Sequence, residues 1–401
     1  MDTQSASLKK LAGRFNLHYG IVQSAYWMAY GCLVSFAAVL LQAKGFAIGS
    51  VGIILALSHV ISIVLQPRVA AWIDRNHTIR LNHVIAAISG AAVLCCLLLF
   101  FCEGRVWAAG ICFVGAAMLH ITNQALVNAL GMETVEKGVP INYGLSRSTG
   151  SITFAIMFFF MGSLVETLGE DVLIFSFSAL GILLVLSVLL YRPPVQKDYR
   201  AKALSKNSGN PVEFFRKYPA FGLALVGVVC MHASHAYINN YMIAIAEKCG
   251  GSSSVTGISI AIAALTELPV LIIFDRLLKK WRVDRLLAAS AVGYGVRAAL
   301  VLLASTVPML YFAQCFHIVG YALFLPSIVH FSRVSVKSED LVQGQAYGGM
   351  AISMAGILGS LTGGFLIDGI GVNGMLAVAV VLPVIGLLIL LYSRKKAQRE
   401  A

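Results

Sequence analysis

Apolar residues along this chain gather in long runs separated by short polar segments. Each run provides the roughly 20 residues that a helix needs to cross the hydrocarbon layer of a bilayer. We count twelve runs, at residues 17–42, 48–72, 80–102, 105–131, 144–166, 171–191, 218–244, 254–274, 283–304, 308–333, 343–368 and 372–393. The pattern predicts an all-α membrane protein with twelve transmembrane helices.

The longest polar segment covers residues 192–217 and divides the runs into two sets of six. It carries seven Lys or Arg residues and two Asp or Glu residues. We therefore predict an N-terminal six-helix bundle over residues 1–191, a cytoplasmic linker loop over 192–217, and a C-terminal six-helix bundle over 218–401. The Lys/Arg bias of cytoplasmic loops accounts for the linker's charge, so we assign it no chemistry.

The overall composition supports a membrane protein. Hydrophobic residues make up 58% of the chain and charged residues 12%, and the mean hydropathy is +0.82, far outside the range of soluble domains. If the runs alternate across the bilayer, 25 of the 30 basic residues lie on one side, three lie on the other, and two lie within runs. This asymmetry predicts a multi-pass protein of the cell membrane with both termini in the cytoplasm. It also explains the net charge of +12 without a nucleic-acid partner.

Signatures of an enzyme or a metal protein are not visible in the sequence. The eight cysteines follow no metal-ligand spacing, and no third ligand accompanies His232 and His235. We find no Ser/His/Asp grouping, paired acidic metal motif or phosphate-binding loop. We therefore expect no enzymatic activity, cofactor or metal, and a monomer whose partners are a small-molecule solute, protons and the lipid bilayer.

The two halves are related by a sequence repeat. Residues 66–75, QPRVAAWIDR, align with residues 267–276, ELPVLIIFDR, at an offset of 201. Tyr143-Gly144 likewise matches Tyr347-Gly348 at an offset of 204. A parallel repeat predicts two bundles related by an axis normal to the membrane, as in many secondary transporters.

Three ionisable residues lie deep within the runs of the second half, namely Glu267, Arg297 and His317. Ionisable groups are costly in hydrocarbon and usually have a partner or a function. Glu267 is either the structural partner of an arginine on another helix or a proton carrier, because apolar surroundings favour the protonated form of a carboxyl group. Arg297 keeps its charge, so it must face Glu267, a cavity or an anionic solute. His317 is either an interhelical contact or part of a proton relay with the other two.

Uncharged polar side chains within the runs are weaker candidates for contacts with a solute. For each one, packing or interhelical hydrogen bonding is the alternative role. The candidates are Tyr26, His120, Asn123, His235, Asn239 and Gln314.

The repeat and the linker together resemble the major facilitator superfamily of transporters. The segment from Tyr143 to Phe154, with Glu267, Arg297 and His317, resembles its oligosaccharide/proton symporter (lactose permease-like) branch, including the spacing of twenty residues from Arg297 to His317. The resemblance implies that Glu267, His317 and Arg297 serve proton coupling. It also implies that Arg147 and Phe154 contact the solute.

The chain also departs from that branch. Ala129 stands where the branch has a sugar-binding glutamate, Phe154 where it has a stacking tryptophan, and Gly320 where it has the proton-carrying carboxylate. These departures move the expected proton role to Glu267 and leave the solute open among a sugar, a nucleoside and an aromatic acid. We predict proton-coupled symport by alternating access. Efflux of amphipathic compounds by proton antiport is the alternative.

Overall fold

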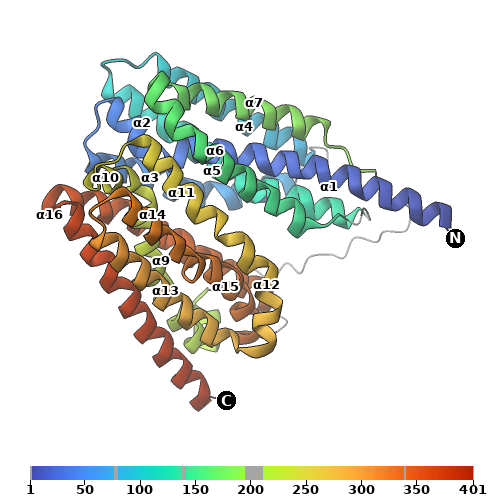
Figure 1. Cartoon of the computed structure of the whole chain (residues 1–401). Helices are drawn as coiled ribbons and strands as arrows, with labels where there is room; N and C mark the ends of the chain where they lie inside the picture. Colours follow the sequence, from blue (N-terminus) through green and yellow to red (C-terminus); the bar gives the residue numbers. More distant parts are fainter. Residues whose placement is uncertain are drawn as a thin grey trace. The chain divides into compact units, whose positions relative to one another are not determined.

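A computed structural model of the chain consists of helices joined by short connections (Figure 1). It describes residues 2–75, 80–137, 139, 141–194, 211–337 and 340–400, and these contain no strand. The predicted all-α architecture is therefore confirmed. Most of the predicted linker lies outside the described residues, but Pro211–Lys217 at its end forms the short helix α8.

The described residues account for twelve spans. Ten helices are long and apolar enough to cross a bilayer, and a pair bent by 48° near Phe36 gives an eleventh span. The twelfth comes from α16 (Leu341–Glu400), whose 60 residues would extend about 90 Å as one straight helix, about three times the hydrocarbon thickness. Gly371 adopts a left-handed φ of 74° there, which glycine tolerates, and separates two helices.

The first half contains seven α-helices and a π-helical turn. They are α1 (Asp2–Tyr30), the π-turn (Gly31–Ser35), α2 (Ala37–Ala43), α3 (Ile48–Arg75), α4 (Leu81–Phe100), α5 (Val106–Glu136), α6 (Tyr143–Leu168) and α7 (Val172–Leu190). The helix α1 begins well before residue 17, where the first apolar run was predicted to start. Hydropathy detects the apolar part of a helix, not its polar extension.

The second half contains several short helices as well as the long α16. They are α8, α9 (Pro219–Asn240), α10 (Met242–Lys248), α11 (Ser253–Leu265), α12 (Glu267–Lys280), α13 (Val283–Leu303), α14 (Val307–Cys315), a 3₁₀ turn (Phe316–Ile318), α15 (Tyr321–Ser335) and α16. Three predicted spans are thus divided, between α9 and α10, between α11 and α12, and between α14 and α15.

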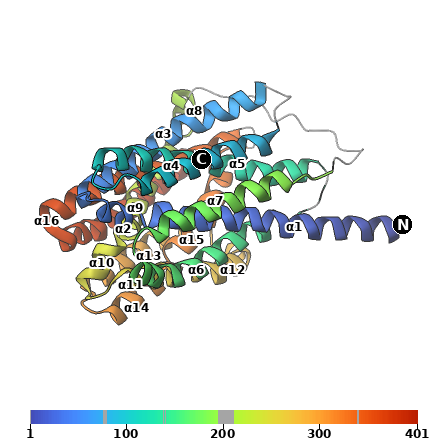
Figure 2. The same cartoon turned by 90° about the horizontal axis from the view of Figure 1, so that it is seen from above.

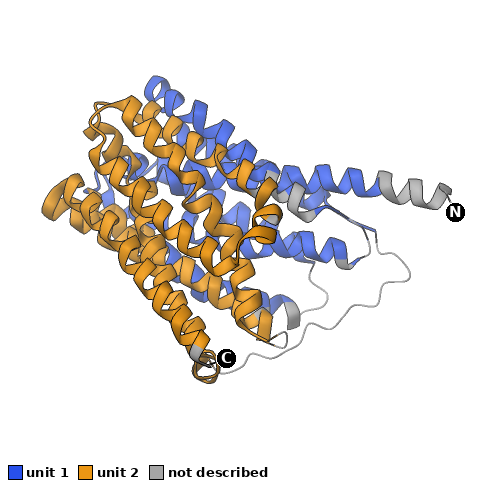
Figure 3. Ribbon diagram, turned by 60° about the horizontal axis from the view of Figure 1, so that its bottom comes forward, with its two compact units in different colours: residues 1–47, 57–204 blue, residues 48–56, 205–401 orange. Residues whose placement is uncertain are grey.

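Two compact units make up the chain (Figure 3). The first consists of residues 1–47 and 57–204, and the second of residues 48–56 and 205–401. The first turns of α3 therefore belong to the second unit and the remainder of α3 to the first.

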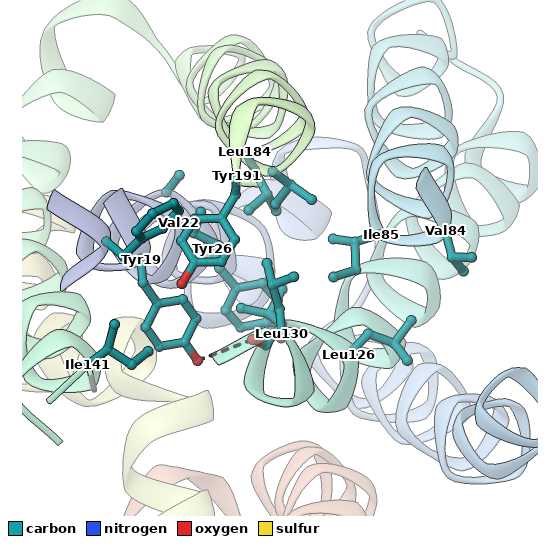
Figure 4. Close-up of a cluster of buried hydrophobic side chains, with 14 of the residues drawn as sticks. Tyr19, Val22, Tyr26, Val84, Ile85, Leu126, Leu130, Ile141, Leu184 and Tyr191 are labelled. Atoms are coloured by element: carbon teal, nitrogen blue, oxygen red, sulfur yellow. Dashed lines mark hydrogen bonds between the residues drawn. The ribbon is translucent and has the colours of Figure 1, made fainter. Parts of the chain in front are cut away.

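In the first unit, α1 packs along α6 and α7, and α4 packs along α5 and α7 (Figures 1 and 2). Its core combines Tyr19 and Tyr26 of α1 with Leu130 of α5 and Leu184 of α7 (Figure 4). The buried Tyr19 hydroxyl donates to the carbonyl oxygen of Val127 at 3.1 Å, which satisfies its polar group within the apolar cluster.

In the second unit, α9 lies along α16, and α13 packs against α15 and α16. Phe221, Tyr294, Phe324 and Leu390 contribute to one buried cluster between these helices. The core therefore surrounds α13, the helix that carries Arg297.

Two of the breaks in the divided spans fall at Glu267 and His317. Glu267 is the first residue of α12, and Pro269 follows in its first turn, where the missing N–H of proline costs no helical hydrogen bond. His317 lies in the 3₁₀ turn, and Gly320 after it has non-helical dihedral angles (φ −79°, ψ −100°). Both candidate residues therefore lie where the α-helix of their span is interrupted.

Candidate functional site

Arg297 is the central charge of the second unit. Its side chain lies in the interior with 1% of its surface exposed. Nη1 donates to His235 Nδ1 at 3.1 Å, and Nη2 donates to Asn239 Oδ1 at 3.2 Å and to Gln314 Oε1 at 2.5 Å. Three of the predicted solute ligands thus surround one of the predicted coupling residues.

These ligands converge from two other helices. His235 and Asn239 lie one turn apart on α9, so both side chains reach Arg297 from the same face. Gln314 lies at the end of α14, immediately before the break in its span. A guanidinium can only donate, so Nδ1 of His235 is the acceptor in this contact.

Glu267 and His317 form a second polar contact in the same unit. His317 Nε2 lies 3.4 Å from Glu267 Oε1, and the side chains are 2% and 16% exposed. His317 Nδ1 is buried and has no hydrogen-bond partner among the described residues. The structure therefore brings Glu267 and His317 together, and Nδ1 of the imidazole can still form a hydrogen bond.

Aromatic rings connect the two polar contacts. The Tyr321 ring stacks on His235, with centroids 4.5 Å apart and planes at 8°, and on His317 at 5.1 Å. The His235 and His317 rings are themselves 5.4 Å apart. His232 adjoins them, 5.1 Å from His235, and its Nδ1 lies 3.2 Å from the Tyr294 hydroxyl. Glu267 and Arg297 are thus joined through a continuous layer of polar rings.

Among the residues that the structure describes, no carboxylate pairs with the charge of Arg297. No Asp or Glu side chain that the structure describes has an oxygen within 4.0 Å of the guanidinium, and its hydrogen-bond acceptors are neutral. The sequence left three possibilities for what Arg297 faces: Glu267, a cavity or an anionic solute. The first of these is not seen as a direct ion pair among the described residues.

The described residues contain no group of His, Cys, Asp and Glu side chains suited to a metal ion.

Three predicted ligands of the first unit make contacts between its helices. Tyr26 stacks on His120, with centroids 4.5 Å apart, and each side chain bonds the backbone carbonyl of the other residue. Asn123 donates to Ser89 Oγ at 2.9 Å. All three candidate side chains are buried, so they hold α1, α4 and α5 together in this conformation.

The remaining two predicted ligands lie on α6. Phe154 packs against Phe158, with ring centroids 4.5 Å apart. The side chain of Arg147 lies outside the described residues, although its backbone belongs to α6.

Sequence reasoning missed Tyr321 and Tyr294, which complete the ring layer. Tyr321 follows His317 by four residues, a spacing that places two side chains on one helical face. That signal was present in the sequence, but the break after the 3₁₀ turn makes the spacing less regular. Nothing in the sequence distinguished Tyr294 from an ordinary core tyrosine.

Comparison with known proteins identifies sequence relatives over most of the chain. The sequence model of the MFS_1 like family matches residues 18–376. The chain is 23% identical to the probable 3-phenylpropionic acid transporter of Escherichia coli (strain K12), over 86% of this chain and 89% of that protein. It is 24% identical to the maltose permease of Geobacillus stearothermophilus, over 95% and 94%.

Solved structures share the fold at lower identity. A variant of the nucleoside transporter NupG superposes with a TM-score of 0.80 at 14% identity, covering 95% of this chain and 99% of that one. A bacterial homolog of the human lysosomal transporter Spinster gives a TM-score of 0.72 at 13% identity, covering 97% and 98%.

Proposed function

Because the chain belongs to the MFS_1 like family of membrane transporters, we propose that it is a secondary active transporter that couples solute import to protons. The solute is a small polar organic compound, namely a sugar, a nucleoside or an aromatic acid, the classes named for its relatives. Transport proceeds by alternating access, with the bundles at residues 1–191 and 218–401 as the moving parts and 192–217 as the linker.

The contact between Glu267 and His317 carries this proposal. Glu267 is a carboxyl group beside an imidazole, 3.4 Å from Nε2, within a membrane-spanning unit. Retention of such a pair in hydrocarbon marks a proton path in membrane transporters. Glu267 takes up a proton on the outer side and releases it to water on the inner side, and His317 adjoins it on that path.

Arg297 and its partners supply the solute site on the second unit. Its hydrogen bonds to His235, Asn239 and Gln314 orient the guanidinium. Because these acceptors are neutral, a polar atom of the solute can replace one of them. Arg147 and Phe154 are the proposed contacts from α6, and Tyr26, His120 and Asn123 hold α1, α4 and α5 together. We assign the protein to the cell membrane as a monomer, with both termini in the cytoplasm.

Uptake into proteoliposomes tests the proposal. Purified protein is reconstituted and presented with labelled maltose, uridine and 3-phenylpropionate, with and without an imposed pH gradient, acidic outside. Symport predicts accumulation of one solute above its external concentration only with the gradient. Accumulation of a solute only under the reversed proton gradient, acidic inside, supports antiport instead, and absence of gradient-dependent movement for any solute refutes proton coupling.

A further inference from the structure

The Nε nitrogen of the Arg297 guanidinium has no acceptor. It is buried and lacks a hydrogen-bond partner among the described residues, whereas Nη1 and Nη2 each donate at least one hydrogen bond. A buried N–H without an acceptor is uncommon because it loses the hydrogen bonds it makes to water. The open position is therefore where an additional acceptor is expected.

The charge around Arg297 indicates what kind of acceptor fits. Guanidinium keeps its proton, and the groups it binds, His235 Nδ1, Asn239 Oδ1 and Gln314 Oε1, are all neutral. Buried charges in proteins are usually paired with an opposite charge. Among described carboxyl groups Glu267 is the obvious counter-ion, but it contacts His317 and makes no ion pair with Arg297 within 4.0 Å.

We propose that the transported solute carries a carboxylate, and that one of its oxygens accepts the hydrogen bond from Arg297 Nε. This inference rests on the proposed transport function and narrows its solute class to organic carboxylates. A carboxylate supplies both missing features, an acceptor and a negative charge, in one charge-assisted hydrogen bond. A sugar hydroxyl would fill the acceptor position but leave the charge unbalanced.

Two residues near this position reach the surface of the second unit. Asn239, which accepts from Arg297, and Glu267, which contacts His317, are both partly exposed. The Nε atom itself is covered in this conformation, so a ligand reaches it only after neighbouring side chains move. The His235 ring that contacts the guanidinium is stacked on Tyr321, which places aromatic surface near the proposed carboxylate position.

Binding measurements on the purified full chain test the inference. Calorimetric titration compares 3-phenylpropionate with 3-phenylpropionamide, which has the same shape and no charge, and includes benzoate, maltose and uridine. We expect a carboxylate to bind at least tenfold more tightly than its amide. Equal affinity of acid and amide, or binding of maltose or uridine with no carboxylate bound, overturns the inference while leaving transport intact. Failure of every carboxylate to bind overturns it as well.

A matched pair of variants locates the interaction. Arg297→Gln should remove the preference for the acid over the amide, whereas Arg285→Gln, at an exposed position on the same helix, should keep it. A preference that survives in Arg297→Gln contradicts the assignment to this residue. If Arg297→Gln does not fold, the acid and amide comparison on the unmodified protein still decides the solute class.

Discussion

Arg297 shows how hydrogen-bond geometry, more than charge alone, defines the candidate site. Lysine at this position keeps the positive charge but has neither the planar fork nor the Nε donor. Its single ammonium group cannot reach His235, Asn239 and Gln314 together as the guanidinium does.

Arg297→Lys is therefore expected to reduce transport by about tenfold or more, since charge-assisted hydrogen bonds contribute roughly 1.5–3 kcal/mol each. Insertion into the membrane should be unchanged. Initial uptake rates per inserted protein measure the effect. Near-normal uptake would mean that only the positive charge at this position matters and not the geometry of the guanidinium.

The sequence identified most of the residues around Arg297 but not their pairing. Deep ionisable residues are recognisable because hydrocarbon penalises them, which selected Glu267, Arg297 and His317. The distances between these residues depend on where the helices of their spans are interrupted. Hydropathy does not detect these interruptions, because Thr266 and Gly320 do not end an apolar run. The sequence therefore left open whether Arg297 faces Glu267, and the structure brings Glu267 to His317 instead.

At the level of elements, α13 depends on a close approach to the broken span beside it. A Cβ added at Gly293 would lie 2.5 Å from the carbonyl carbon of Val319 and 2.6 Å from the nitrogen of Gly320. Backbone atoms cannot move aside as a flexible side chain does. The glycine thus fixes the distance between the helix of Arg297 and the segment after His317.

Gly293→Ala should destabilise the protein by roughly 1–3 kcal/mol, the usual cost of an overpacked core. Gly295→Ala is the control on the same helix, because its Cβ would meet only Pro383 Cβ, at 3.7 Å. That variant should be neutral or stabilised by about 0.5–1 kcal/mol. Thermal melting in detergent compares the two, and equal melting temperatures would contradict the packing argument.

The short helix α8 is attached to the second unit by a surface contact. Lys217 Nζ and the Tyr218 hydroxyl both donate to Asp340 Oδ2 at 2.7 Å, and these hydrogen bonds lower the pKa of Asp340. A lowered carboxyl pKa stabilises the contact above the ordinary pKa of the group, and that stabilisation is lost as the pH falls through the lowered value. The stability of this contact is therefore constant from pH 5 to 8, because that range lies about one pH unit or more above a typical Asp pKa.

Asp340→Asn should accordingly leave the pH profile of transport between pH 5 and 8 unchanged, because Asp340 is ionised throughout it. Limited proteolysis should cut the variant faster near α8, since the ion pair with Lys217 is lost. Uptake rates across this pH range are the measurement. A profile displaced in the variant would give Asp340 a part in coupling.

At the scale of the whole molecule, the spans and the sequence repeat were predictable because hydropathy and charge bias act over long stretches.

Membrane topology is also a property of the whole molecule, and cysteine labelling tests it. A cysteine introduced at Ser208, in the predicted cytoplasmic linker, should react with an impermeant thiol reagent only from the cytoplasmic side. One at Ser252 should react only from outside, and the reverse pattern would contradict the charge asymmetry.

The central claim is that protonation of Glu267 is coupled to solute movement. Glutamine has nearly the same shape as the protonated side chain but cannot release a proton, so Glu267→Gln should lose coupling and retain solute exchange. Glu247→Gln, at an exposed position on α10, is the matched control.

The direct measurement is the pH change outside proteoliposomes when solute is added without an imposed gradient. The unmodified protein and Glu247→Gln should make the medium alkaline as solute and protons enter together. Glu267→Gln should give no pH change while it still exchanges labelled for unlabelled solute. Alkalinisation by Glu267→Gln at the unmodified rate would contradict the account and move the coupling site away from this carboxyl group.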